Sequence, residues 1–295
     1  MEACHSFWSE PNRCRSQGEI RFPDFEQLTA ILSALEWKRH SGPVRMLTDT
    51  AGAAYFREIG LSVFWDGTES ILDDLAGTTD PYAFWAAGKF WALRSMPVPC
   101  VMLDTDLIVW ENVESRLTAD VVTAHPEPLS PRTYPDPSVF RLTEGYSFPE
   151  KWDFGLNAAN TAFLYFRDRT LRDRYLEEAA EFMQHVRTDG ADPVQTMCFA
   201  EQRILPMCAA ETGKTLGYLM KPGEVLGQNF VTHTWGFKQV LRISKPARDA
   251  FCMRCVRRIH LDFPREAELL SGCRDLREYE LRYREAKAGP EPDAE

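Results

Sequence analysis

The chain has 295 residues, enough for one large α/β domain or two small ones, and its 44% hydrophobic content is sufficient for a substantial core. Its formal net charge of −10 argues against a nucleic-acid partner, because a phosphate backbone requires a basic surface. No apolar stretch reaches the length of a transmembrane segment, and the N-terminus lacks the apolar run of a signal peptide, so we expect a cytoplasmic protein.

Strand and helix patterns alternate through the first third of the chain. Strands are predicted at 3–8, 44–47, 61–65 and 98–103, and helices at 25–40, 51–59, 69–76 and 82–94. Such alternation is typical of βαβ units and predicts an α/β fold with a mostly parallel central sheet flanked by helices. Ligands bind such sheets at the carboxyl ends of the strands. That edge would hold the polar residues that follow the strands, namely Thr48, Asp49, Asp66, Asp104 and Asp106.

The second half of the chain begins with a proline-rich stretch. Six prolines between 126 and 149 predict a long loop, a kind of segment that is usually functional or disordered. Further strands are predicted at 120–124, 161–166, near Val225 and at 230–235, and further helices at 172–186 and 193–208. Because no repeat or linker is visible, we predict one principal domain at 1–264. A charged helix and a disordered tail would follow at 265–295.

Asp104 and Asp106 directly follow the apolar run at 98–103. An Asp-x-Asp spacing arises by chance in a chain of this composition, but the buried strand before it makes the pair informative. Two carboxylates at such a position must be solvated, paired or bound to a metal. A hard divalent cation of the kind that holds phosphates fits this oxygen pair. The alternative is a pair of charges that caps a loop at the end of the strand.

Eight scattered cysteines are most simply reduced thiols in a chain without a secretion signal. Cys252 and Cys255 form the one close pair. A zinc site would also need His260 and Cys273, whose spacing is unusual for zinc ligands. Two thiols packed on one face of a helix are the simpler interpretation.

Four segments, in this order, resemble glycosyltransferases with the nucleotide-sugar-binding GT-A fold, and in particular the retaining, glycogenin-like group. They are the strand with Asp-Thr-Asp at 98–106, Asn-Thr-Ala-Phe-Leu-Tyr-Phe at 160–166, Glu-Gln-Arg-Ile-Leu at 201–205 and His-Thr-Trp-Gly-Phe-Lys at 233–238. The chain departs from the group's pattern at Glu201, where Asp is more usual, and at Ala162, where Gly is usual. The layout is also similar to uncharacterised bacterial proteins related to glycosyltransferases.

The resemblance implies a GT-A-type, Rossmann-like domain at 1–264 that binds a nucleotide-sugar. It assigns Asp104, Asp106 and His233 to a divalent metal, Mn²⁺ or Mg²⁺, and an imidazole ligand favours Mn²⁺. Contacts with the nucleotide-sugar would come from Lys89, Thr48, Asp49, Thr105, Asn160, Gly236 and Lys238. Glu201, Gln202 and Asp153 would face the sugar or the acceptor. Each has an ordinary alternative: a structural histidine, a solvated lysine, an exposed helical glutamate or a turn-forming asparagine.

The function implied is a hexosyltransferase-like, Mn²⁺-dependent glycosyltransferase. It would move a sugar from a UDP-sugar to a saccharide or another hydroxyl-bearing acceptor, with retention of configuration. One alternative is a catalytically silent nucleotide-sugar- or glycan-binding protein of the same fold. Another is a nucleotidyltransferase, which is disfavoured because no glycine-rich phosphate loop is visible near the N-terminus.

Overall fold

The computed structural model describes residues 1–221, 223–225 and 227–288, and within them a seven-stranded sheet has the order β3-β2-β1-β4-β7-β6-β8. Its strands are β1 (Ala3–Phe7), β2 (Val44–Thr48), β3 (Thr68–Ser70), β4 (Cys100–Leu103), β6 (Val121–Glu127), β7 (Ala158–Phe166) and β8 (Leu216–Tyr218). Strand β7 runs against its neighbours β4 and β6, and the other four pairings are parallel. The predicted α/β fold with a mostly parallel sheet is therefore confirmed.

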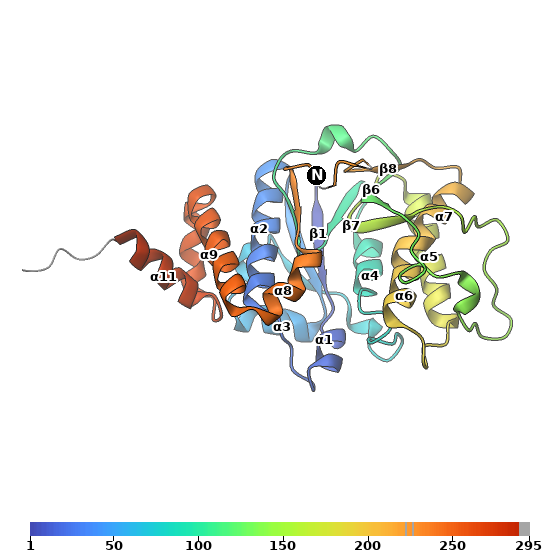
Figure 1. Ribbon diagram of the computed structural model, residues 1–295, viewed down its shortest axis with the longest axis horizontal. Helices are drawn as coiled ribbons and strands as arrows, with labels where there is room; N and C mark the ends of the chain where they lie inside the picture. Colours follow the sequence, from blue (N-terminus) through green and yellow to red (C-terminus); the bar gives the residue numbers. More distant parts are fainter. Residues whose placement is uncertain (222, 226, 289–295) are drawn as a thin grey trace, which may run out of the picture.

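Helices cover both faces of this sheet (Figure 1). The helices are α1 (Glu10–Arg15), α2 (Asp24–His40), α3 (Thr50–Glu58), α4 (Gly88–Ser95), α5 (Arg169–His185), α6 (Pro193–Cys198), α7 (Ile204–Glu211), α8 (Lys238–Ile243), α9 (Lys245–Asp262), α10 (Pro264–Ala267) and α11 (Arg277–Ala288). One core contains residues of α2 and α9, and the other contains residues of α4, α5 and α7. In β4, Val101 and Leu103 join the first core, whereas Cys100 and Met102 join the second. Burial on both faces explains the continuous apolar run of this strand.

Short elements complete the chain. Strands β5 (Leu107–Val109) and β9 (Val231–His233) form a separate antiparallel pair. The single turns are the 3₁₀ segments η1 (Ser62–Phe64), η2 (Asp73–Leu75), η3 (Glu114–Arg116), η4 (Pro137–Val139), η6 (Trp235–Phe237) and η7 (Glu268–Gly272), and the π-helical segment η5 (Phe199–Arg203). Among the described residues, no helix has both the length and the apolar character needed to cross a membrane. The polar tail was predicted at 286–295, but helix α11 continues to Ala288, and residues 289–295 lie outside the described residues.

The predicted strand at 61–65 is wrong. This segment contains the 3₁₀ turn η1, and the third strand forms at β3, which overlaps the first two residues of the predicted helix at 69–76. Leu61 and Phe64 are both buried, which is the three-residue spacing of a 3₁₀ turn rather than the alternation of a strand. Asp66, which was predicted at the carboxyl end of this strand, therefore has a different position. Its Oδ2 accepts a hydrogen bond from the amide of Val44, at the start of β2, so Asp66 lies away from the carboxyl ends of the strands.

Other helix and strand boundaries also differ from those predicted from the sequence. The predicted helix at 82–94 begins only at Gly88, because the side chain of Asp80 accepts hydrogen bonds from the amides of Tyr82 and Ala83 and holds turns there. Val225 lies in a turn rather than a strand, and strand β8 was not predicted. The predicted strand at 230–235 is shorter than expected, at Val231–His233.

Glu36 on α2 is a buried carboxyl group, and burial raises its pKa to about 7, against the opposing effect of Arg39. The folded state thus favours the protonated acid, so its stabilising contribution is full below the unfolded pKa and is lost as the pH rises through 7. We expect Glu36→Gln, which keeps the shape without the charge, to raise the free energy of unfolding by about 1–2 kcal/mol at pH 8. The gain should vanish near pH 4.5. Urea unfolding at the two pH values measures it, and an equal effect at both would contradict the assignment.

Candidate functional site

A cleft of about 540 Å³ opens at the carboxyl ends of the parallel strands. Its walls come from β1, α4, the β4–β5 turn, the ends of β6 and β7, η5, and the segment after β9. Nine of the residues predicted from the sequence line it: Lys89, Asp104, Thr105, Asp106, Asn160, Glu201, Gln202, His233 and Lys238. The fold therefore gathers at one place side chains that are as much as 149 positions apart in sequence (238 − 89).

Asp104, Asp106 and His233 form a cluster in this cleft, with one ligand atom from each lying within 4.8 Å of the others. The amide of Asp104 donates to the carbonyl of Ala162 on β7 (2.8 Å), which ties the end of β4 to its neighbour. The chain then turns tightly, because the amide of Leu107 donates back to the carbonyl of Asp104 (3.0 Å). Both carboxylates therefore sit on a short, fixed turn.

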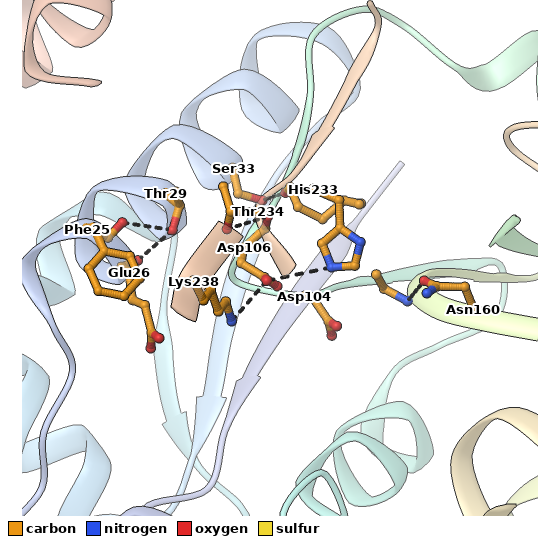
Figure 2. Close-up of polar contacts among 12 residues, drawn as sticks. Phe25, Glu26, Thr29, Ser33, Asp104, Asp106, Asn160, His233, Thr234 and Lys238 are labelled. Atoms are coloured by element: carbon orange, nitrogen blue, oxygen red, sulfur yellow. Dashed lines mark hydrogen bonds and ion pairs between the residues drawn. The ribbon is translucent and has the colours of Figure 1, made fainter. Parts of the chain in front are cut away.

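The pairing of β5 with β9 brings the histidine to this turn. Leu107 lies opposite His233 in the register, and the amide of Thr234 donates to the carbonyl of Asp106 (3.1 Å). Figure 2 shows the imidazole directed toward the Asp106 carboxylate, with Nε2 at 3.6 Å from Oδ2. Burial lowers the pKa of His233, so its ring is neutral near pH 7 and has a lone pair available for a metal.

Two lysines neutralise the carboxylates of the cluster. Lys238 Nζ lies 2.9 Å from Asp106 Oδ2, and Lys89 Nζ lies 2.5 Å from Asp104 Oδ1 (Figure 2 shows the first pair). Burial acts to raise the pKa of Asp106, but Lys238 and His233 outweigh it and hold that pKa below its usual value. At Asp104 burial prevails over Lys89, and the pKa is raised.

Glu201 is fixed from three directions. Its carboxylate forms an ion pair with Lys89 and accepts a hydrogen bond from the hydroxyl of Thr161 (2.6 Å). Its carbonyl accepts a bond from the hydroxyl of Tyr175 (2.7 Å). The residue lies on η5, and such π-helical turns often occur at functional sites. Lys89 is thus shared by Asp104 and Glu201, whose charges raise its pKa although burial alone would lower it.

Amide side chains line the other part of the cleft. The Nδ2 group of Asn160 donates to Glu127 Oε1 (3.1 Å), and its Oδ1 accepts from the amide of Ala162 (3.1 Å). The hydroxyl of Tyr134 donates to Gln202 Oε1 (2.5 Å). Sequence reasoning missed both Glu127 and Tyr134. Tyr134 lies in the proline-rich loop, whose length already indicated a function. Glu127 is the last residue of β6, at the ligand-binding edge of the sheet, and that position was the available signal.

Four of the predicted contacts lie outside the lining of the cleft. Thr48 donates its hydroxyl hydrogen to the carbonyl of Phe7 (2.6 Å). Asp49 caps α3 through the amide of Gly52 and also accepts bonds from Ser9, so both of its oxygens serve the fold.

The other two are Asp153 and Gly236. Asp153 accepts a bond from the amide of Gly155 in its own turn. A Cβ on Gly236 would meet no atom within 4 Å, so this position does not require glycine for close packing.

All eight cysteines are free of disulfides, and the metal-ligating groups that lie close together in the described part of the chain are those of Asp104, Asp106 and His233 rather than cysteines. Cys252 and Cys255 are buried on one helix, as expected from their spacing. His260 Nε2 is hydrogen-bonded to Glu280 Oε2 (2.6 Å), and the thiol of Cys273 points to the carbonyl of Gly60 (3.5 Å). The simpler interpretation of the pair therefore holds.

The chain is similar in structure to solved glycosyltransferases. Mouse xyloside xylosyltransferase 1 in its apo form is 13% identical with a TM-score of 0.38, covering 75% of this chain and 86% of that one. An active-site mutant of LgtC is 10% identical with a TM-score of 0.40, covering 74% and 72%. GlyE from Streptococcus pneumoniae TIGR4 is 12% identical with a TM-score of 0.37, covering 82% and 51%. The solved structures found in this way are glycosyltransferases, the class that the four sequence segments resemble.

Comparison with curated proteins gives no match. One family model matches residues 1–245, a span that includes the whole central sheet and every lining residue of the cleft. The match ends at the first residue of α9. The chain therefore belongs to the family described as a family of unknown function, DUF6734.

Proposed function

We propose that this protein is a Mn²⁺-dependent glycosyltransferase that moves a hexose from a UDP-sugar to a hydroxyl-bearing acceptor, with retention of configuration. Residues 1–264 would form the domain that binds the nucleotide-sugar. The observation that carries the proposal is the convergence of Asp104, Asp106 and His233 in a cleft that also contains Lys89 and Lys238. A cation site beside two ammonium groups suits a bound diphosphate.

The three side chains fit a divalent cation. Their ligand atoms lie within 4.8 Å of one another, close to the roughly 4 Å that separates ligands on opposite sides of such an ion. Two carboxylates with one neutral imidazole favour Mn²⁺ over Mg²⁺, which prefers oxygen ligands alone. When bound, the ion would act as a Lewis acid on the leaving diphosphate.

Two lysines would act on the same leaving group. Negative charge grows on the diphosphate as its bond to the sugar breaks, and fixed positive charges in a partly buried site stabilise it strongly. Lys89 and Lys238 are both mostly buried, with side chains 15% and 25% exposed, and both face the carboxylates of the cluster. Their ammonium groups would turn to the diphosphate when the cluster holds a cation.

The opposite side of the cleft would hold the sugar. Positive charge grows on the sugar ring during transfer, and the fixed carboxylate of Glu201 is in place to stabilise it. The amides of Asn160 and Gln202 carry hydrogen-bonding groups suited to sugar hydroxyls. Their partners Glu127 and Tyr134 hold both amides in fixed orientations.

A silent nucleotide-sugar-binding protein is the alternative, and one observation favours it. Lys89 and Lys238 pair with Asp104 and Asp106, so each of these carboxylates has a counter-charge from the protein itself.

Turnover decides between the two functions. We expect the protein to release UDP from at least one member of a panel of UDP-sugars in the presence of Mn²⁺, and EDTA should stop the release. The anomeric configuration of the product, followed by NMR, tests retention. Binding of a UDP-sugar without UDP release under any metal condition would establish the silent alternative.

A further inference from the structure

A ridge of exposed apolar side chains lies beside the cleft. The ridge consists of Trp235, Phe237, Val240 and Ile243, which are 75%, 43%, 39% and 75% exposed. Phe237, Val240 and Ile243 follow one another at three-residue spacing, which places them along one side of a helical segment. Large apolar side chains that gather in solvent mark a surface that contacts a partner or a membrane.

The ridge is continuous with the cleft. Trp235 belongs to the lining of the cleft, two residues after the proposed metal ligand His233. Helix α8 lies near α1, which follows the carboxyl end of β1, since Arg242 of α8 and Arg15 of α1 line the same groove (Figure 1 labels both helices). Whatever covers the ridge therefore lies against the mouth of the cleft.

Positive charge accompanies the ridge, although the whole chain carries −10. Residues 235–258 contain a single acid, Asp249, against Lys238, Arg242, Lys245, Arg248, Arg254, Arg257 and Arg258. The guanidinium of Arg254 lies 5.8 Å from the ring centre of Phe251, and that ring lies 6.4 Å from Phe237.

Some of these cations are already paired. Arg242, Lys245 and Arg248 share their charges with Glu26, Asp249 and Asp24, respectively. Arg254 and Arg257, by contrast, have no carboxylate within 4.0 Å among residues 1–221, 223–225 and 227–288. Arg254 therefore leaves positive charge available for an external anion near Phe251, whose ring neighbours Phe237 of the ridge.

This combination fits a membrane surface better than a small ligand. A small ligand needs a concave pocket, whereas Trp235 and Ile243 protrude with three quarters of their surface exposed. Indole and phenyl rings with aliphatic neighbours, flanked by Lys and Arg, are typical of segments that lie in the bilayer interface. We propose that the ridge inserts into the interfacial layer of an anionic phospholipid bilayer and holds the mouth of the cleft against the membrane.

Vesicle binding is independent of transfer chemistry. One consequence, that an acceptor carried in the membrane would reach the cleft without leaving the bilayer, rests on the proposed function. The docking itself does not, because the ridge contains none of the proposed metal ligands or sugar-binding residues. A failure of vesicle binding and a failure of UDP release are therefore separate results.

The test is co-flotation of the full chain, in EDTA, with vesicles of phosphatidylcholine containing about one third phosphatidylglycerol. We expect binding that weakens in pure phosphatidylcholine vesicles and in about 0.5 M salt, because lipid charge contributes to it. Val240→Ser and Ile243→Ser together should lower the affinity about tenfold or more. Leu281→Ser is the matched control, because it removes a 54% exposed leucine from α11 and should bind like wild type.

Three outcomes would overturn the proposal. The first is that the wild-type protein binds neither kind of vesicle. The second is that the ridge variant and the control variant bind vesicles equally well. The third is that the protein does not bind vesicles but forms a concentration-dependent dimer, which Ile243→Ser dissociates. The last would make a second copy of the chain the partner of the ridge. Circular dichroism of the variants verifies that lost binding is not lost folding.

Discussion

Replacing Asp106 by asparagine is expected to lower Mn²⁺ affinity at least about a hundredfold. Mutating a residue that only hydrogen-bonds a metal ligand already lowers metal affinity by about 10- to 100-fold, and losing the ligand itself should lower it more. The neutral amide is a weaker ligand, and it also leaves the ammonium of Lys238, now 2.9 Å from the carboxylate, without its counter-charge. That ammonium would repel an incoming cation. Asp104→Asn and His233→Ala should also weaken Mn²⁺ binding, because each replaces a metal ligand by a weaker one or removes it. Isothermal calorimetry with Mn²⁺ measures all three.

The matched control is Asp189→Asn. Asp189 pairs with Arg141 through a side chain that is 77% exposed and lies outside the lining of the cleft. Its removal takes away one negative charge, as Asp106→Asn does, and should leave the affinity unchanged. If a variant of the cluster keeps wild-type affinity and its circular dichroism spectrum is normal, that residue is not a metal ligand.

The position of Asp104 and Asp106 was predictable because it depends on local sequence. An apolar run that is buried on both faces identifies a central strand, and the residues that follow it must lie at the edge of the sheet. The arrival of His233 was not predictable from composition or periodicity. It depends on the pairing of β5 with β9, two three-residue strands more than 120 positions apart, and such a pairing leaves no local pattern. Only the resemblance carried by 233–238 placed His233 with the carboxylates.

Some residues predicted to contact the nucleotide-sugar have local roles in the fold that the same sequence could have indicated. Asp49 precedes a helix, and an aspartate at that position commonly caps the helix rather than binding a ligand. Tyr134 was missed for the opposite reason. It comes from a long loop whose path depends on packing across the cleft, and a turn-rich sequence does not fix which side chain points inward.

Lys89→Met is expected to lower the free energy of unfolding in EDTA by about 3 kcal/mol, because it leaves the carboxylates of Asp104 and Glu201 without their shared cation. The pKa of Lys89 is raised in the folded state. The stabilisation from its ion pairs is therefore complete at pH 7.5, because it declines only when the pH rises above the pKa of the unfolded state toward the pKa of the folded state. Urea unfolding measures the loss. Lys214→Met is the control, because Lys214 also pairs with an aspartate, at 2.6 Å, but in a more exposed place, where solvent weakens the pair and the expected loss of stability is much smaller.

Mn²⁺ gives this experiment a second readout. In the variant, a bound divalent cation would replace part of the positive charge that Lys89 supplied to Asp104, so Mn²⁺ should restore more stability to Lys89→Met than it adds to wild type. Lys89→Arg, which keeps the charge, should need no such restoration. If Lys89→Met is as stable as wild type and does not respond to Mn²⁺, the carboxylates do not share the lysine in the manner described. If it is destabilised and Mn²⁺ has no effect, Lys89 is a structural counter-ion and the cluster is not a metal site.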